Sequence, residues 1–480
     1  MSITQIFKRY LPRGSFVRGV IVLSGGATAS QVILMAAVPI LTRLYSAEDF
    51  GIVAVFGSIL SILSVISSLR YELAIPIAND DEEAVHGIVL ALLVALATTL
   101  VSFLVIVGFR DQITEAVKIP QMAVYLWLLP LGLLPLSIYK VFSYWAIRVK
   151  EFSAIARTKL AQSVSSVAVQ VGGASFGAIA LLLGQVIGQT VGTSSLALLA
   201  IREKYHLFRK VRPKTLLSIA WRYRQFPCFS ALGGLLNTVG MQLPPVLFTV
   251  LFNPAVAGIY ALAHRVLSLP MSLVGQAIGN VFLARAAEAR REGNLAVLVA
   301  KVHDKLAEIA MPPALILALI APELFALIFG TEWREAGIFA RLMTPMLYFQ
   351  FILSPISTLF NVLEKQKQGM FLQLAMLVSR CLSLTIGGWL DDARLAVTLF
   401  SLASAASYFG FLVWVVLVSG NYWSVIVKPT MKTFGRGLLI VSPLCITTFF
   451  APNMFLLIFS FAITLCLTMW RYLMVLKSES

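Results

Sequence analysis

Long apolar runs, separated by short polar or charged segments, occupy most of the chain. Each run is close to the roughly 20 residues that an α-helix needs to cross the hydrocarbon core of a bilayer. The apolar–polar alternation of a barrel strand is absent, and the runs are too long for one, so the pattern predicts helices. The fourteen predicted membrane-spanning helices cover residues 17–44, 50–69, 84–109, 120–147, 153–175, 177–200, 227–252, 256–283, 303–329, 336–363, 368–389, 395–419, 433–450 and 453–475.

Composition supports an all-α integral membrane protein. Of 480 residues, 59% are hydrophobic and 12% are charged, whereas soluble domains have about 25% charged residues. A soluble core could not bury this much apolar surface, so a soluble globular class is excluded. The net charge of +16 raises the question of nucleic acid, but the cations lie in short loops between apolar runs. That placement indicates membrane topology and not a nucleic-acid partner.

The distribution of Lys and Arg predicts the orientation of the chain. With the N-terminus in the cytoplasm, 28 of the 38 cations fall in inside segments, 6 in outside segments and 4 within helices. Segments on the cytoplasmic side are enriched in Lys and Arg, so the split supports cytoplasmic N- and C-termini. The first helix follows a basic tail without a recognisable cleavage site, and we expect it to remain as a signal anchor.

The longest basic link, residues 202–224, separates six predicted helices from eight. Its eight Lys and Arg residues are explained by topology, and an amphipathic segment on an anionic leaflet is the alternative. The acidic run at 79–83 is interpreted as a solvated turn on the same side.

Two stretches on either side of this link match each other. Residues 44–56 read LYSAEDFGIVAVF and residues 251–263 read LFNPAVAGIYALA, each joining the first two helices of its half. Parallel halves of this kind are a known transporter plan, with the substrate site between them. The predicted organisation is an N-terminal lobe of six helices (1–200), a linker (201–226), a second six-helix lobe (227–419) and a final helix pair with the tail (420–480).

A polar stripe runs along the predicted helix 256–283. Its members recur every three or four residues and so share one helical face: Arg265, Ser268, Ser272, Gln276 and Asn280. A charge near the bilayer centre costs several kcal/mol, about 3 on insertion scales, and such residues usually face a wet cavity. We expect Arg265 to bind an anionic substrate there, with Ser272, Gln276 and Asn280 beside it. His264 is either part of this site or a neutral, packed side chain.

Three further cations lie within predicted helices: Arg18, Lys140 and Arg380. Arg380 is near the middle of its helix and is a second candidate anion ligand, the alternative being a buried ion pair or bonds to backbone carbonyls. Arg18 and Lys140 complete the candidate site, although each is close enough to a helix end to reach the membrane surface. Carboxylates at membrane depth are few, so these cations outnumber their potential partners.

The sequence contains no motif for nucleotide binding, metal binding or catalysis. The sequence has no phosphate-binding loop, and its four cysteines, Cys228, Cys381, Cys445 and Cys466, form no metal-ligand cluster. The glycines of GQVIGQTVG at 184–192 are interpreted as a close helix contact. The predicted outside loops are short and leave no room for a catalytic domain. We therefore expect no metal, no cofactor and no enzyme activity.

Five stretches carry a family resemblance: PILTRLYSAEDFGIVAVF, LRYELAIPIA, FPCFSALGGLLN, AGIYALAHRVLSLPMSLVGQAIGNVF and LFALIFGTEWREAG. They are similar to Wzx-type polysaccharide flippases, in the polysaccharide transporter branch of the MOP exporter superfamily, over most of residues 15–365. The resemblance implies a MATE-like fold with a V-shaped cavity. In the related lipid II flippases, cavity arginines on the first and eighth helices matter, and Arg18 and Arg265 match them by helix and approximate depth. Fourteen helices depart from the twelve of many Wzx proteins.

The function implied is transfer of undecaprenyl-pyrophosphate-linked oligosaccharide from the cytoplasmic to the periplasmic leaflet by alternating access. The oligosaccharide would be a repeat unit of lipopolysaccharide O-antigen, capsule or exopolysaccharide. The implied partners are the bilayer, this lipid-linked substrate, and the polymerase and chain-length proteins of the same pathway. A MATE-like small-molecule exporter is one alternative, although it would need intramembrane carboxylates. A membrane polysaccharide polymerase or glycosyltransferase is another, although it would need an acid/base pair or metal ligands.

Overall fold

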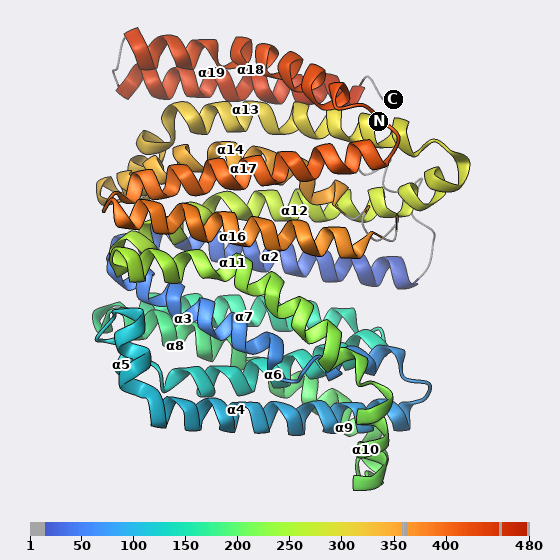
Figure 1. Ribbon diagram of the computed structural model, residues 1–480. Helices are drawn as coiled ribbons and strands as arrows, with labels where there is room; N and C mark the ends of the chain where they lie inside the picture. The colour runs from blue at the N-terminus through green and yellow to red at the C-terminus, as the bar shows by residue number, and fades with distance from the viewer. Residues whose placement is uncertain (1–14, 358, 360–362, 364, 451–453, 478–480) are drawn as a thin grey trace. The chain divides into compact units, whose positions relative to one another are not determined.

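The structure, a computed structural model, describes residues 15–477 except 358, 360–362, 364 and 451–453. Helices account for nearly all of the described residues, and none of these residues lies in a strand (Figure 1). The chain divides into two compact units, Met1–Ala261 and Leu262–Ser480, and the boundary falls inside one long helix. The all-helical class predicted from the apolar runs is therefore confirmed.

Unit 1 contains the first helices of the chain. They are α2 (Ser15–Leu44), α3 (Ala47–Ile66), the 3-10 helix η1 (Tyr71–Ile77), α4 (Asp81–Val117), α5 (Met122–Tyr125), α6 (Leu128–Arg148), α7 (Phe152–Gly172), η2 (Ala174–Phe176), α8 (Ala178–Thr190), α9 (Thr193–Phe208), α10 (Pro213–Arg222), the π-helix η3 (Phe226–Ser230) and α11 (Ala231–Leu251). Helix α12 (Pro254–Glu292) begins in this unit and continues into the next.

Unit 2 contains the rest of α12 and the later helices. They are α13 (Leu295–Phe329), η4 (Thr331–Trp333), α14 (Arg334–Ile356), α16 (Gln366–Trp389), α17 (Ala393–Val418), α18 (Ser424–Phe450) and α19 (Met454–Lys477). Helix α14 packs against α13 and α17, α16 packs against α17, and α18 packs against both α13 and α19. The final helix pair is thus joined to unit 2 through α13.

Among the described residues, eleven helices are long and apolar enough to cross a membrane. Each of the fourteen predicted stretches overlaps a helix. Three of those helices, α7, α12 and α18, are outside the eleven and carry Lys or Arg within their length. The chain is a multi-pass membrane protein, whereas the count of fourteen spans is not confirmed.

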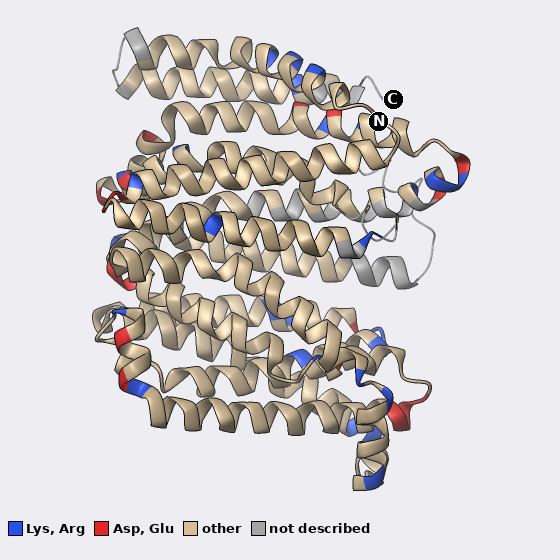
Figure 2. Ribbon diagram, in the orientation of Figure 1, with Lys and Arg blue, Asp and Glu red and all other residues tan. Residues whose placement is uncertain are grey.

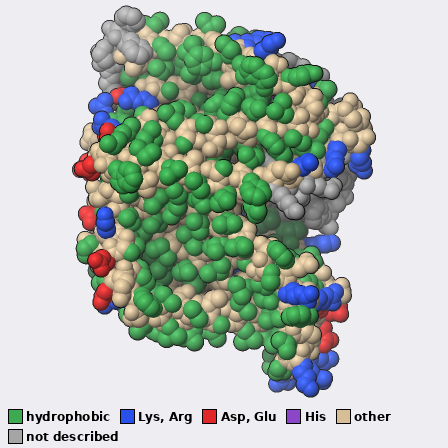
Figure 3. All heavy atoms as spheres, in the orientation of Figure 1, with side chains coloured by type: hydrophobic (Ala, Val, Ile, Leu, Met, Phe, Trp, Pro, Cys, Tyr) green, Lys and Arg blue, Asp and Glu red, His purple; other side chains and the backbone are tan. Residues whose placement is uncertain are grey.

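Helix α4 has one face buried in unit 1 and an opposite, exposed face that is also apolar. Ala84, Ile88, Ala91 and Ala95 share one face and are buried against the unit. The opposite face is a stripe of exposed leucines and other large apolar side chains: Leu93, Leu96, Leu100, Val101, Leu104 and Val107. Such a surface suits hydrocarbon and not water. In each unit most charged residues lie at or near the helix ends (Figure 2), and apolar side chains cover the helix flanks in the view of Figure 3.

The two stretches that matched in the sequence begin their helices in the same way. Ser46 caps α3 by accepting a hydrogen bond from the Asp49 backbone N–H, with a donor–acceptor distance of 3.2 Å. At the corresponding place before α12, the Asn253 side chain accepts from the Val256 backbone N–H at 3.0 Å. Each cap satisfies a backbone donor that the first helical turn leaves free. The local structure of the two stretches is therefore alike.

Each of the two matched stretches contains a glycine, Gly51 or Gly258, that lies against the backbone of the other stretch. Both contacts are inside unit 1. A Cβ on Gly51 would lie 1.8 Å from the carbonyl oxygen of Pro254, and a Cβ on Gly258 would lie 1.9 Å from that of Ala47. Ala47 and Pro254 occupy equivalent positions in the matched stretches, so the contact is reciprocal. Residues without a Cβ are required there. The division into two six-helix lobes stays a prediction.

Unit 2 is held together by two apolar clusters. One joins α12, α13, α14 and α17 around Phe282, Leu306 and Ile352. The other joins α13 to the last two helices. An ion pair between Arg471 of α19 and Glu308 of α13 also joins these two helices. The last helix pair is therefore fixed to α13 by both apolar packing and charge.

Candidate substrate-binding site

Arg265 lies on α12, within the stretch predicted to span the membrane, and is half-buried. No hydrogen bond or ion pair joins its guanidinium to another residue of the described part of the chain; its backbone carbonyl accepts from the Ser268 hydroxyl at 3.4 Å. An arginine has five N–H donors and cannot lose its charge in a protein, so an unpaired one at this depth is costly. A bound anion would satisfy both the charge and the donors.

Two glycines of α12, on either side of Gln276 in the chain, lie against α14. A Cβ on Gly275 would lie 3.0 Å from the Ser354 hydroxyl of α14, and one on Gly279 would lie 3.6 Å from Pro355. These two glycines therefore pack against α14. Gln276 and Asn280 each follow a packed glycine and so lie about 100° round the helix from it. Ser272 belongs to the same stripe, and the side chains of these three residues lie outside the described part.

Arg380 lies on α16 and is held by α17. Its Nε donates to the Ser404 hydroxyl at 2.9 Å and one terminal nitrogen donates to the Tyr408 hydroxyl at 2.7 Å. The guanidinium carbon also lies 5.4 Å from the centre of the Phe400 ring and 5.3 Å from that of Tyr408. The side chain is 8% exposed. Hydroxyl oxygens and ring faces thus stabilise this charge without a carboxylate among the described residues.

His264 links the two arginines in space. Its ring is half-buried on α12, next to Arg265 in sequence, and lies within electrostatic range of the Arg380 charge on α16. The Arg380 charge on α16 therefore acts on the part of α12 that carries His264. Such a region favours an anion over a cation.

Lys140 lies in unit 1 and donates hydrogen bonds to another residue of that unit. Its ammonium on α6 binds the backbone carbonyl of Ser64 at 2.6 Å and the Ser64 hydroxyl at 3.2 Å, both on α3. The side chain therefore points to α3 and not to the membrane surface. Arg18 belongs to α2, but its side chain lies outside the described residues. Lys140 and Arg18 thus belong to unit 1, whereas the other candidate residues belong to unit 2.

A buried group near Lys140 was missed by the sequence reasoning. Glu72 of η1 is 2% exposed and accepts a hydrogen bond from the Ser68 hydroxyl. Both Glu72 and Arg70 lie within electrostatic range of Lys140. Arg70 has a positive φ of 64°, and its Nε is buried without an acceptor among the described residues. The signal in the sequence was the pair of opposite charges in LRYEL, between the predicted helices 50–69 and 84–109.

Two carboxylates of unit 2 bind arginines other than Arg265. Glu323 of α13 binds Arg334 at 2.8 Å, and Glu335 of α14 binds Arg394 through two contacts of 2.7 and 2.8 Å. Both pairs involve residues at helix ends. They therefore do not neutralise Arg265.

Three apolar cavities lie within the units. One, of about 580 Å³, lies among α3, α4 and α6 of unit 1. Two others, of about 500 and 260 Å³, lie beside Tyr348 of α14 in unit 2, and the smaller one is also lined by Met271 of α12 and Tyr472 of α19. These linings suit apolar chains and not sugars.

The fold defines the class as multi-pass helical membrane proteins, and comparison with known proteins identifies the family. The chain matches the model of the Polysaccharide biosynthesis protein family over residues 40–337 and belongs to that family. The family predicted from the motifs is therefore confirmed.

Among curated proteins, the Succinoglycan biosynthesis transport protein ExoT of Rhizobium meliloti (strain 1021) is 25% identical over 339 residues. The match covers 69% of this chain, and the chain spans 65% of the length of that relative. Among solved structures, the lipid II flippase MurJ in an inward closed conformation has a TM-score of 0.76 at 13% identity, covering 96% of this chain and 99% of that one.

An inward-facing multidrug resistance MATE family transporter of the MOP superfamily has a TM-score of 0.64 at 14% identity, covering 81% of this chain and 94% of that one. At such low identities these two likenesses show the fold alone. The fold is the MOP type that the resemblance implied.

Proposed function

We propose that the protein moves a lipid-linked oligosaccharide, carried on undecaprenyl pyrophosphate, from the cytoplasmic to the periplasmic leaflet of a bacterial inner membrane. It does so by alternating access, with both termini in the cytoplasm. Family membership and the name of the curated relative support a role in polysaccharide transport. The observation that carries the proposal is Arg265, an arginine at membrane depth without a partner among the described residues.

The chemistry of the substrate matches that of the site. A pyrophosphate carries several negative charges and accepts two parallel hydrogen bonds from one guanidinium. Arg265 supplies these donors, and Arg380 adds positive potential. Hydroxyl and amide side chains along α12 suit a sugar head, and apolar helix flanks suit a prenyl tail. The protein acts on the location of the substrate and makes or breaks no covalent bond.

A small-cation exporter would place different residues at this depth. Cation coupling requires a carboxylate that is open to the transport path. Glu72 is a buried carboxylate, but it is bound to Ser68 and lies beside two cations. A cationic drug would also be repelled by the charge around His264. The substrate class that fits is therefore an anion.

Deletion of the chain in its host tests the proposal. We expect surface polysaccharide to be lost while the lipid-linked oligosaccharide accumulates on the cytoplasmic leaflet, where external reagents cannot reach it. Purified protein in proteoliposomes should expose a labelled undecaprenyl-pyrophosphate oligosaccharide to an external hydrolase. If deletion leaves the lipid-linked sugar accessible from the periplasm, the proposal is wrong.

A further inference from the structure

Helix α10 has two apolar faces, and packing uses one of them. Ile219 is 5% exposed and lies on the face toward α4, where the Tyr71 hydroxyl donates to the Ala220 carbonyl at 3.2 Å. Leu217 and Trp221 are four residues apart and share the other face, on which they are 74% and 69% exposed. A ten-residue helix needs one apolar face to pack. The second face is left for another surface.

Cations flank this second face. Lys214 lies one turn before Leu217 and is exposed, and the Arg224 guanidinium lies 4.3 Å from the centre of the Trp221 ring. The sequence from 209 to 224 contains six Lys and Arg residues and no Asp or Glu. The face therefore combines two large apolar side chains with positive charge. A surface that is apolar and negatively charged complements it.

The position of α10 is fixed at the end of a membrane-spanning helix. Glu83, in the first turn of α4, binds Arg222 at 2.9 Å and accepts a hydrogen bond from the Tyr223 hydroxyl at 3.0 Å. Burial, together with this carboxylate, raises the pKa of Tyr223, so the hydroxyl remains a donor. Helix α10 lies crosswise to α4 in Figure 1. A helix with this placement lies along the membrane surface and not through it.

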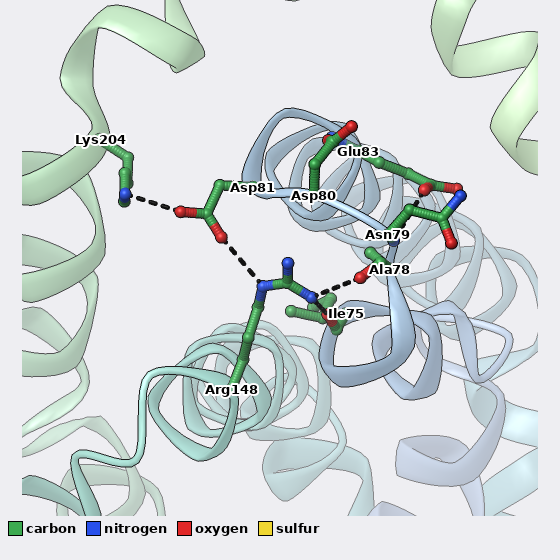
Figure 4. A network of polar contacts seen from close by, with 8 residues as sticks. All are labelled: Ile75, Ala78, Asn79, Asp80, Asp81, Glu83, Arg148 and Lys204. Atoms are coloured by element: carbon green, nitrogen blue, oxygen red, sulfur yellow. Dashed lines mark hydrogen bonds and ion pairs between the residues drawn. The ribbon is translucent and has the colours of Figure 1, made fainter.

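A second group of polar contacts holds the N-terminal end of α4 in unit 1 (Figure 4). Asp81 binds Arg148 of α6 at 3.2 Å and Lys204 of α9 at 2.7 Å. Arg148 also donates to the carbonyls of Ile75 and Ala78 at 3.1 and 2.8 Å. The start of α4 is thus held by α6, α9 and the residues before it. Helix α10 is attached to this end of α4 through Glu83.

We propose that the exposed face of α10, formed by Lys214, Leu217, Trp221 and Arg224, binds the surface of an anionic phospholipid leaflet. Leu217 and Trp221 enter the boundary between head groups and acyl chains, where tryptophan is favoured in membrane proteins. Lys214 and Arg224 contact the lipid phosphates, and anionic lipids attract each such cation. A soluble protein partner is the alternative, but the crosswise position beside the α4 terminus favours lipid.

Site-directed spin labelling of the full-length protein tests this assignment. One label replaces Leu217, and a control label replaces Ser218, which is exposed and lies about 100° round the helix from Leu217. Both labels are placed in a background whose four cysteines are changed to serine. Each protein is placed in nanodiscs of phosphatidylglycerol or of phosphatidylcholine. We expect the label at 217 in phosphatidylglycerol to collide with oxygen several-fold more often, relative to a water-soluble nickel chelate, than the label at 218.

The charge component is tested with the double variant Lys214→Gln/Arg224→Gln. In phosphatidylglycerol, we expect the label at 217 in this variant to become accessible to the nickel chelate. The same loss of protection is expected in phosphatidylcholine for the protein that keeps Lys214 and Arg224. Loss of two surface cations should weaken the contact by roughly 30-fold. Equal protection at 217 in both lipids would overturn the anionic assignment. Water exposure of 217 in phosphatidylglycerol, equal to that of 218, would overturn the membrane contact altogether and point to a protein partner.

Discussion

Arg265 on α12 and Arg380 on α16 carry the same charge within the same unit, but their surroundings differ. Arg380 is 8% exposed and is held by two hydroxyls and two aromatic rings. Arg265 is more exposed, and its guanidinium has no partner among the described residues. One charge is therefore satisfied by the fold, whereas the other is left for something that the fold does not supply. We therefore propose that Arg265 contacts the ligand and that Arg380 has a supporting role.

The largest expected effect is that of Arg265→Ala on transport. Without the guanidinium, the pyrophosphate loses a bidentate, charge-assisted contact, and we expect export of surface polysaccharide to stop. Protein stability should not fall, because the substitution removes an unpaired charge that costs free energy in the folded state. Complementation of a deletion strain, with membrane insertion checked by immunoblot, measures both. Wild-type export by Arg265→Ala would contradict the assignment.

Arg380→Ala should show the reverse pattern. Two hydrogen bonds from a charged group are lost, which we expect to lower the free energy of unfolding by about 3 kcal/mol. For a unit of this size, that corresponds to a fall of about 5–10 °C in the apparent melting temperature. Export should decline in proportion to the amount of folded protein. Thermal unfolding of the purified variant in detergent checks the prediction. An undiminished melting temperature together with abolished export would place Arg380 on the substrate instead.

Lysine substitutions separate charge from geometry. Arg265→Lys keeps the charge but loses the planar fork, so we expect export roughly tenfold below wild type, equivalent to one weakened hydrogen bond. In Arg380→Lys, one ammonium must replace a fork that reaches both Ser404 and Tyr408, so stability should fall while export per folded molecule stays near normal. Initial transport rates normalised to folded protein distinguish the two. Identical behaviour of the two lysine variants would remove the distinction.

The smallest effects are expected from the hydroxyl partners of Arg380. Ser404→Ala and Tyr408→Phe each delete one acceptor, and each should cost about 1–2 kcal/mol of stability with little change in transport. The matched control is Ser401→Ala on the same helix, since the Ser401 hydroxyl is buried without a partner among the described residues. The melting temperature of the Ser401→Ala control should be higher than that of either Ser404→Ala or Tyr408→Phe. Loss of transport without loss of stability would mean that these hydroxyls contact the substrate.

The positions of the spanning helices could be predicted because a run of about 20 apolar residues is a strong signal. Their ends could not. Helix α4 continues to Val117, beyond the predicted limit of 109, and α13 begins at Leu295, before the predicted 303. Hydropathy marks the thickness of the hydrocarbon, whereas helical hydrogen bonds continue into water. The predicted solvated turn at 79–83 likewise contains the acids that bind Arg148, Lys204 and Arg222.

Candidate residues could be selected from the sequence, but not their contacts. Charge at membrane depth was enough to select Arg265, Arg380 and Lys140. The partners of Arg380 are 24 and 28 residues away on another helix, and that of Lys140 is 76 residues away. Such pairs depend on which helix faces pack together, which periodicity does not specify. Glu72 escaped notice because a 3-10 helix carries it into the interior between two spans.

Binding of undecaprenyl pyrophosphate to the purified protein in nanodiscs tests the central claim most directly. Wild type, Arg265→Ala and Arg380→Ala are compared, with uncharged undecaprenol as the control ligand. The account predicts that Arg265→Ala weakens pyrophosphate binding by at least about tenfold, because a charge-assisted contact of about 1.5–3 kcal/mol is lost. Undecaprenol binding should not change, and folded Arg380→Ala should bind nearly as wild type. Equal pyrophosphate affinity for wild type and Arg265→Ala would contradict the claim.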